Sequence, residues 1–261
     1  MDIIIFGGQS NMQGQTECLS DSSVVEHAWE YRWLSDTLVP LCNPVGEDIT
    51  YDKKEGFRVT PGMSGDVWRA QHVLGAACYG HTNMVPKFCE SYHKETGADV
   101  VAVHAAKGAT IVGQWLSGTP GYEMLVEKAL GAISQVRQTA EPGHIYFVWL
   151  QGESDACDSR TKEEYKEQIR QLRAALEADL GIEKFGIIRV GRFANDERDL
   201  EIITAQDEVC DEDEGFVMLT TIATELNEIP EYMNPEVAGH YSAKGQEKLG
   251  EVAGKALGQM L

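Results

Sequence analysis

Ser10 is the first residue in this chain whose type and position suggest chemistry. It follows four apolar residues at 3–6, three of them β-branched, which predict a short buried strand, and two glycines that let the backbone turn sharply. Ligands of open α/β sheets bind beyond the carboxyl ends of the parallel strands, so a hydroxyl on the first turn after this strand would be held rigidly at the floor of such a site. Two other interpretations stay open: Ser10 only caps the next helix, or the turn cradles a phosphate, although no Walker lysine or dinucleotide glycine spacing is present.

A second group of chemically capable residues follows the apolar strand predicted at 145–150. Gln151, Glu153 and Asp155 come directly after it. An amide and two carboxylates have no packing reason to follow so apolar a strand, so they indicate a site at its carboxyl end. The simpler interpretation is a capped, solvated turn. His240, in a loop before a helix that Ser242 would cap, is a third candidate, although a lone histidine in a loop is usually a surface residue.

Composition narrows the classes of partner. The chain has 261 residues, of which 43% are hydrophobic, and a formal charge of -20. Such a charge argues against nucleic acid or anionic membrane as partner, because both are polyanions, and it fits a neutral small molecule better. Six scattered cysteines without a C-x-x-C pair indicate free thiols, and no cluster at metal-ligand spacing is evident, so we expect no metal and no cofactor. No membrane span and no leader are evident in the given chain, which favours a cytoplasmic protein, and the oligomeric state stays open.

The elements that must position these residues alternate along the chain. Strands are predicted near 3–6, 99–104, 145–150, 185–190 and 216–220, with helices near 83–95, 122–138, 161–180, 197–210 and after 242. Alternating strands and helices predict one domain over 1–261, a three-layer α/β/α fold around a mainly parallel five-stranded sheet.

The segment from about 16 to 80 lacks regular periodicity and contains three tryptophans, Trp29, Trp33 and Trp68. Long irregular segments in compact domains are commonly functional, so we expect it to cover the Ser10 site and form part of the substrate pocket. Tryptophans stack well on sugar rings, but a large aromatic side chain in a loop is more often a local core anchor.

The residues Gly8 to Met12, in the order Gly-Gln-Ser-Asn-Met, resemble the first sequence block of the SGNH hydrolases. The likeness is to the carbohydrate-esterase branch that includes sialate O-acetylesterases and acetyl xylan esterases. Gln151 to Asp155 resemble a second block of this branch, and His240-Tyr241-Ser242 is similar to the run at its catalytic histidine. Lys107, Ala109 and Val237 depart from the branch pattern. The resemblance implies a flavodoxin-like SGNH fold.

The resemblance also implies roles for individual residues. Ser10 would be the nucleophile and His240 the base. The backbone N–H groups of Ser10 and Gly80, together with the Gln151 amide, would form the oxyanion hole. Candidates for substrate contact are Asn11, Trp115 and Trp68.

The carboxylate partner of His240 is the least determined of these roles. The superfamily places an Asp three residues before the histidine, but Val237 stands there and cannot accept a hydrogen bond. We expect Glu153 to replace it, since it follows a strand whose end the parallel topology brings near Ser10 and His240, and the resemblance to the branch implies a triad role for the Glu of this block. Glu236 and Asp155 remain alternatives.

Taken together, these features predict a serine esterase that hydrolyses small acyl esters, above all O-acetyl esters, on carbohydrates such as acetylated sialic acid or xylan oligosaccharides. Two alternatives stay open: a non-catalytic carbohydrate-binding relative of the same fold, and a lipase or esterase acting on lipid-type esters.

Overall fold

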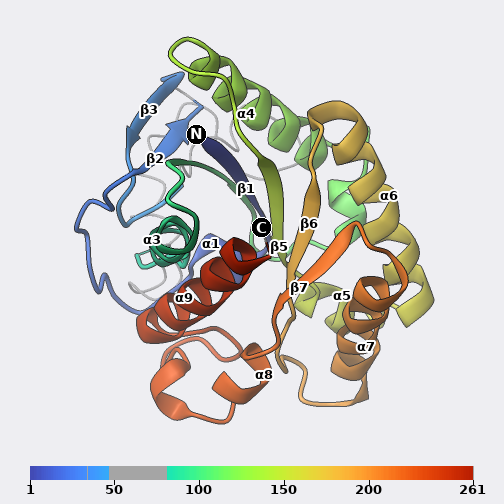
Figure 1. Ribbon diagram of the computed structural model, residues 1–261. Coiled ribbons are helices and arrows are strands. Elements are labelled where there is room, and N and C mark those ends of the chain that lie inside the picture. The colour runs from blue at the N-terminus through green and yellow to red at the C-terminus, as the bar shows by residue number, and fades with distance from the viewer. Residues whose placement is uncertain (34, 47–80, 261) are drawn as a thin grey trace.

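The computed structural model describes residues 1–33, 35–46 and 81–260. Figure 1 shows a twisted central sheet with helices on both faces. The strands are β1 (Asp2–Gly8), β2 (Ala28–Arg32), β3 (Thr37–Pro40), β4 (Val100–Ala106), β5 (Ile145–Leu150), β6 (Lys184–Ile188) and β7 (Phe216–Thr220). The longer helices are α3 (Val85–Thr96), α4 (Pro120–Arg137), α6 (Lys162–Leu180), α7 (Glu197–Glu212) and α9 (Ala243–Gln259). The short helices are α1 (Ser10–Gln13), α5 (Glu153–Cys157), α8 (Ala223–Leu226), η3 (Val112–Trp115) and η4 (Pro230–Tyr232).

The strand order is β3-β2-β4-β1-β5-β6-β7, and all neighbours are parallel except β2 and β3. The predicted three-layer, mainly parallel α/β/α architecture is therefore confirmed. After β1 the chain forms β2, β3 and β4 on one side of β1 and then crosses to the other side at β5. This reversal makes the carboxyl ends of β1 and β5 the point where doubly wound sheets bind ligands.

The described sheet has seven strands rather than the predicted five. Both additional strands lie in the segment predicted to be irregular. β2 extends the parallel sheet beside β4, and β3 pairs antiparallel with β2 at the sheet edge, where Pro40 is tolerated because an edge residue needs no second ladder partner. Trp29 and Trp33 pack with the core here, as local anchors.

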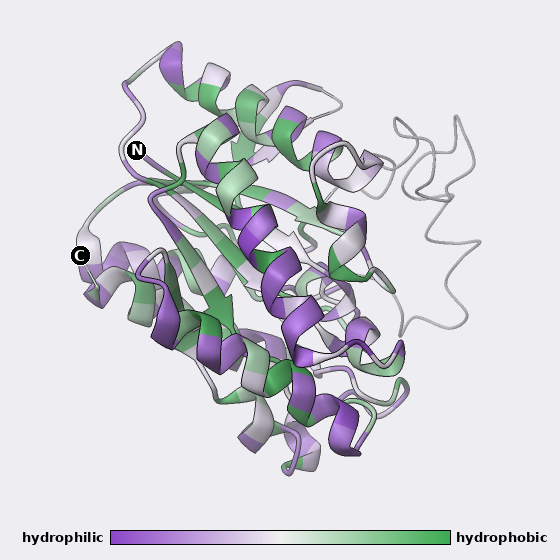
Figure 2. Ribbon diagram, turned by 90° about the vertical axis from the view of Figure 1, so that its right-hand side faces the viewer, coloured by the Kyte–Doolittle hydropathy of each residue, from purple (hydrophilic) through white to green (hydrophobic). Residues whose placement is uncertain are grey.

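Hydrophobic residues concentrate on the strands and on the inward helix faces, and hydrophilic residues on the outward faces (Figure 2). Helices α3 and α9 cover one face of the sheet, and α4, α6 and α7 cover the other (Figure 1). Glycines let α3 and α9 approach closely: a Cβ at Gly254 would lie 2.1 Å from the Phe88 carbonyl oxygen. No helix in the described part of the chain is long and apolar enough to cross a membrane.

Candidate active site

Ser10 begins α1 directly beyond the end of the central strand β1. Gly8 has a φ of +148°, and a Cβ there would lie 2.1 Å from the Leu150 carbonyl oxygen, so only glycine permits this exit from the strand. The side chain of Ser10 is 5% exposed. Its backbone N–H contacts no acceptor among the described residues, as the first N–H groups of a helix do when no side chain caps them.

Three side chains hold the carbonyl groups of this short helix in place. The Gln246 amide donates to the Asn11 carbonyl oxygen at 2.8 Å, and the Met12 carbonyl oxygen accepts from Asn83 Nδ2 at 2.7 Å and lies 3.1 Å from His104 Nε2. The donors come from α9, from the residues before α3 and from β4. A four-residue helix is thus held from three directions, and Ser10 sits on a rigid support.

His240 lies in the loop between η4 and α9. Its Nδ1 is 3.0 Å from the Ala238 carbonyl oxygen, which can only accept, so Nδ1 carries the ring proton and Nε2 is left with a lone pair. The residue is 8% exposed, and this burial lowers the pKa of the imidazole, although the carbonyls of Ala238 and Val237 oppose the shift. A neutral imidazole with a free Nε2 is the form that a general base requires.

The Asn11 side chain joins the Ser10 turn to the His240 loop. Its Nδ2 donates to the Gly239 carbonyl oxygen at 3.3 Å, and its Oδ1 accepts from the backbone N–H of Tyr241 at 3.2 Å. These two residues flank His240, so the residue next to the serine contacts both neighbours of the histidine. Asn11 was expected to contact substrate. The structure instead commits both ends of its amide to internal bonds.

Glu153 lies at the start of α5, next to the same asparagine. Its Oε1 accepts from Asn11 Nδ2 at 2.8 Å, while its Oε2 has no hydrogen-bond partner among the described residues. Burial raises the pKa of this carboxyl, the negative charges of Asp155 and Asp199 add to the shift, and the Asn11 bond opposes it. Contrary to expectation, its described contacts do not include His240, whose Nδ1 faces a backbone carbonyl instead.

The two alternative acids lie in different surroundings and have no described contact with the histidine. Glu236 is exposed, and Asp155 is buried in an ion pair with Arg160, with 2.9 Å between Arg160 Nε and Asp155 Oδ1. None of the three acidic candidates therefore makes a described contact with the imidazole.

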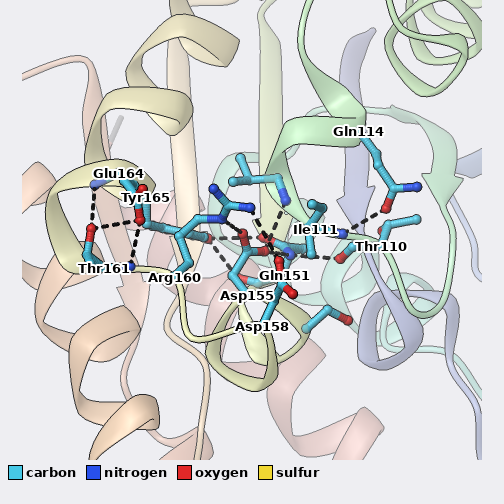
Figure 3. A network of polar contacts seen from close by, with 12 residues as sticks. Thr110, Ile111, Gln114, Gln151, Asp155, Asp158, Arg160, Thr161, Glu164 and Tyr165 are labelled. Carbon is cyan, nitrogen blue, oxygen red and sulfur yellow. Dashed lines mark hydrogen bonds and ion pairs between the residues drawn. The ribbon is translucent and has the colours of Figure 1, made fainter.

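Gln151 belongs to an interior network rather than to an oxyanion hole (Figure 3). Its Nε2 donates to the Thr110 carbonyl oxygen at 2.9 Å and to Asp155 Oδ2 at 2.5 Å. The backbone carbonyl oxygen of Gln151 accepts from the Tyr165 hydroxyl at 2.9 Å. Both amide hydrogens are thereby directed into the protein. The predicted oxyanion role of Gln151 is not compatible with this arrangement.

The turn after β4 runs beside Ser10. Gly108 donates its N–H to Gln13 Oε1 at 2.8 Å, and a Cβ on Gly108 would lie 3.5 Å from the Ser10 Cβ. Trp115, predicted to contact substrate, is 0% exposed and packs edge-on against Trp149, so it is a core residue. Gly80 and Trp68, predicted for the oxyanion hole and the substrate pocket, lie outside the described residues.

A group of possible metal ligands, not apparent from sequence spacing, lies at the amino ends of the parallel strands, whereas Ser10 lies beyond their carboxyl ends. Single ligand atoms of His27, His93 and Asp99 are all within 4.8 Å of one another. The two imidazoles are stacked, with 6° between their planes, so their in-plane lone pairs do not converge on one point. Asp99 precedes β4, whereas Ser10 follows β1, so the length of the sheet separates this group from the serine.

Sequence reasoning missed Phe193, which packs against His240 with 5.8 Å between ring centroids and 77° between ring planes. The available signal was its position: it follows β6, and thus lies beyond the same sheet edge as Ser10.

The three-layer fold, with a Gly-Gln-Ser-Asn turn after its first strand, is that of an SGNH hydrolase. Residues 1–259 match the family described as carbohydrate esterase, sialic acid-specific acetylesterase. The chain belongs to this family of carboxylic ester hydrolases.

Solved structures support the fold assignment. A protein from Arabidopsis thaliana is similar at a TM-score of 0.65 with 18% identity, covering 99% of this chain and 96% of its own. A carbohydrate acetylesterase from Xanthomonas citri has a TM-score of 0.55 and 15% identity, with 100% and 57% covered. A lipase/acylhydrolase from Enterococcus faecalis has a TM-score of 0.53 and 14% identity, with 100% and 97% covered. A search of curated proteins finds no match.

Proposed function

We propose that this protein is a serine esterase that removes small acyl groups, chiefly acetyl, from hydroxyl groups of carbohydrates, with Ser10 as nucleophile and His240 as base. The observation that carries the proposal is the Asn11 bridge. One side chain adjacent to Ser10 bonds to both residues adjacent to His240, which ties the nucleophile turn and the histidine loop together. Family membership supports the substrate class.

The reaction follows from the state of the two side chains. His240 Nε2 takes the proton of Ser10 Oγ as this oxygen attacks the ester carbonyl carbon. The tetrahedral intermediate then expels the sugar alcohol, which receives the proton from Nε2, and an acyl-serine remains. Water attacks the acyl-serine with the same histidine as base, which releases the carboxylic acid and restores Ser10.

The negative charge on the carbonyl oxygen needs hydrogen-bond donors already in place. The N–H of Ser10, at the start of α1, is such a donor. A single oxyanion donor is worth roughly 3 kcal/mol of transition-state stabilisation.

The orientation of His240, which a carboxylate provides in other triads, falls here to the Ala238 carbonyl. This carbonyl holds the required tautomer but carries no full charge. Glu153 acts on the histidine indirectly. It accepts a hydrogen bond from Asn11, and Asn11 in turn holds the loop on both sides of the histidine.

The experiment compares p-nitrophenyl acetate with p-nitrophenyl octanoate, using the wild type, Ser10→Ala and the matched control Ser134→Ala, a change at an exposed position on α4. We expect the acetate to be the better substrate and Ser10→Ala to lower kcat by several orders of magnitude. A serine-directed phosphonate should label Ser10 alone.

Each rival function has its own outcome. A preference for octanoate would favour a lipid esterase, and a wild type that hydrolyses neither ester but binds acetylated sugars would be a non-catalytic relative. Labelling at another serine would refute the assigned nucleophile.

A further inference from the structure

The loop after β6 is held by an unusual series of side-chain bonds. Asp199, which is buried at the start of α7, accepts the backbone N–H groups of Phe193, Ala194 and Asn195 at 3.2, 3.0 and 2.7 Å. The preceding N–H, that of Arg192, donates to Asn227 Oδ1 at 2.6 Å. Four consecutive N–H groups are thus satisfied by side chains, so the loop has a set conformation without being part of a helix or strand.

This loop presents the ring of Phe193 to the histidine loop. The ring meets the His240 imidazole edge to face. A Cβ on Gly239, which has a φ of +75°, would lie 2.3 Å from Phe193 Cδ2, so the glycine before His240 permits the close approach. Phe193 nevertheless remains partly exposed. A large apolar ring that is held rigidly yet left partly open to solvent is available to a ligand.

The proposed reaction defines which part of the substrate lies beside this ring. His240 Nε2 must come within hydrogen-bond distance of the alcohol oxygen that leaves, because it returns the proton there. The group attached to that oxygen is the carbohydrate. A side chain in contact with the imidazole therefore borders the sugar rather than the acyl group.

We propose that Phe193 is a specificity residue of this esterase: it forms an apolar wall of the leaving-group site and packs against the C–H face of a pyranose. The proposal rests on the proposed function, since it takes His240 as the group that protonates the sugar oxygen. It gives Phe193 the stacking role for which Trp115 is too deeply buried.

The test compares two acetate esters that share an acyl group and differ in the alcohol. One is methyl 2,3,4-tri-O-acetyl-β-D-xylopyranoside, and the other is ethyl acetate, whose alcohol is too small to cover the ring. Phe193→Leu keeps an apolar side chain against His240 but removes the flat face, and Phe193→Trp restores one. We expect the ratio of kcat/KM for the xyloside to kcat/KM for ethyl acetate to fall about 10-fold in the leucine variant and to be retained in the tryptophan variant.

An equal fall in kcat/KM for both esters would overturn the proposal, because Phe193 would then only position His240. An unchanged ratio would overturn it as well. Melting temperatures of both variants control for misfolding of the loop.

Binding separates this proposal from the proposed function. In a Ser10→Ala background, calorimetry with the acetylated xyloside should show binding weakened several-fold by Phe193→Leu. If the wild type hydrolyses neither ester, the proposed function fails while this comparison still decides the role of Phe193. Equal affinity with Phe and Leu would refute the apolar wall.

Discussion

Asn11 Nδ2 lies 2.8 Å from Glu153 Oε1, and the same nitrogen lies 3.3 Å from the carbonyl oxygen of Gly239. One amide group therefore links the acidic residue beyond β5 to the loop that carries the histidine. The carboxylate holds the asparagine and the asparagine holds the loop, so the acid is one residue removed from the imidazole.

Removing this link should impair catalysis without removing either reacting group. Asn11→Ala deletes the contacts to Glu153, Gly239 and Tyr241, which frees the His240 loop to shift. Misplacing a catalytic group by about 1 Å can cost roughly 10²-fold, so we expect a loss of that order in kcat on p-nitrophenyl acetate. A variant within threefold of the wild type would show that the loop does not need the bridge.

Glu153→Gln should have a mild effect on turnover. The Gln side chain keeps an oxygen that can accept from Asn11, so kcat should fall by no more than about 10-fold, against the roughly 10⁴-fold loss seen when a directly bonded triad acid is neutralised. A 10⁴-fold loss in kcat would show that the carboxylate contacts the imidazole during the reaction.

The same variant has a stability signature. Burial raises the pKa of Glu153 above the unfolded value, so the native state retains this proton to higher pH than the unfolded chain does. The wild type therefore loses stability as pH rises from the unfolded pKa through the native one, and Glu153→Gln does not incur this loss. Urea unfolding at pH 4 and pH 7 should show the variant gaining relative to the wild type at the higher pH. An unchanged difference between the two proteins would contradict the assigned shift.

The pH dependence of turnover reports on His240. The base must be neutral, and burial lowers the pKa of its imidazole from the ordinary value of 6.5. The acid limb of kcat/KM should therefore have its midpoint below pH 6.5, with activity rising as pH increases through it. Phe193→Ala removes the phenyl ring that covers the His240 imidazole, and it should therefore move the midpoint of the acid limb to higher pH. A midpoint above 6.5 in the wild type would contradict a desolvated base.

His104 should make the fold sensitive to acid. Burial, with the positive charge of Lys128 adding to it, lowers the pKa of this imidazole to about 3. Between pH 6.5 and 3 the unfolded chain binds a proton that the native state does not, so stability falls as pH decreases across this window. His104→Gln retains a donor for the Met12 carbonyl but does not titrate.

Urea unfolding at pH 7 and pH 4.5 measures this effect. The wild type should lose about 2.7 kcal/mol more than His104→Gln between the two conditions, at 1.36 kcal/mol for each of the two pH units below 6.5. His144→Gln, at a half-exposed position, is the matched control and should behave as the wild type does. Equal losses in all three proteins would show that His104 is protonated without cost.

Ala109 occupies a backbone conformation that favours glycine. Its φ is 58°, which costs an alanine about 1–2 kcal/mol, partly offset by the lower entropy of its unfolded chain. Ala109→Gly should therefore raise the free energy of unfolding by roughly 0.5 kcal/mol. Ala175→Gly, inside α6, should lower it by about 1 kcal/mol. A loss at position 109 as large as that at 175 would contradict the conformational argument.

The local features of this fold could be predicted from the sequence, because they depend on residues near one another in the chain. The run at 3–6 became the fully buried β1, and the helix predicted near 161–180 is α6, which Thr161 and Glu164 cap. Gly181 ends that helix in the left-handed conformation. Five runs of strand character identified a parallel α/β/α fold, whose carboxyl strand ends must share one edge. β2 and β3 escaped prediction because neither has the long apolar run of a buried central strand.

The partners of the site residues were decided only by the tertiary structure. Glu153 and His240 are 87 positions apart, and a pattern that brings their loops to one sheet edge does not determine which atoms meet there. Asn11 lies between the Glu153 carboxylate and the His240 loop. The Ala238 carbonyl oxygen, not a carboxylate, is the hydrogen-bond partner of His240 Nδ1. The Gln151 amide turns inward because Thr110 and Asp155 offer acceptors within hydrogen-bond distance, and leaving these two buried acceptors unpaired would cost free energy. Side-chain direction at a strand end follows from such competition among neighbours that only folding brings together.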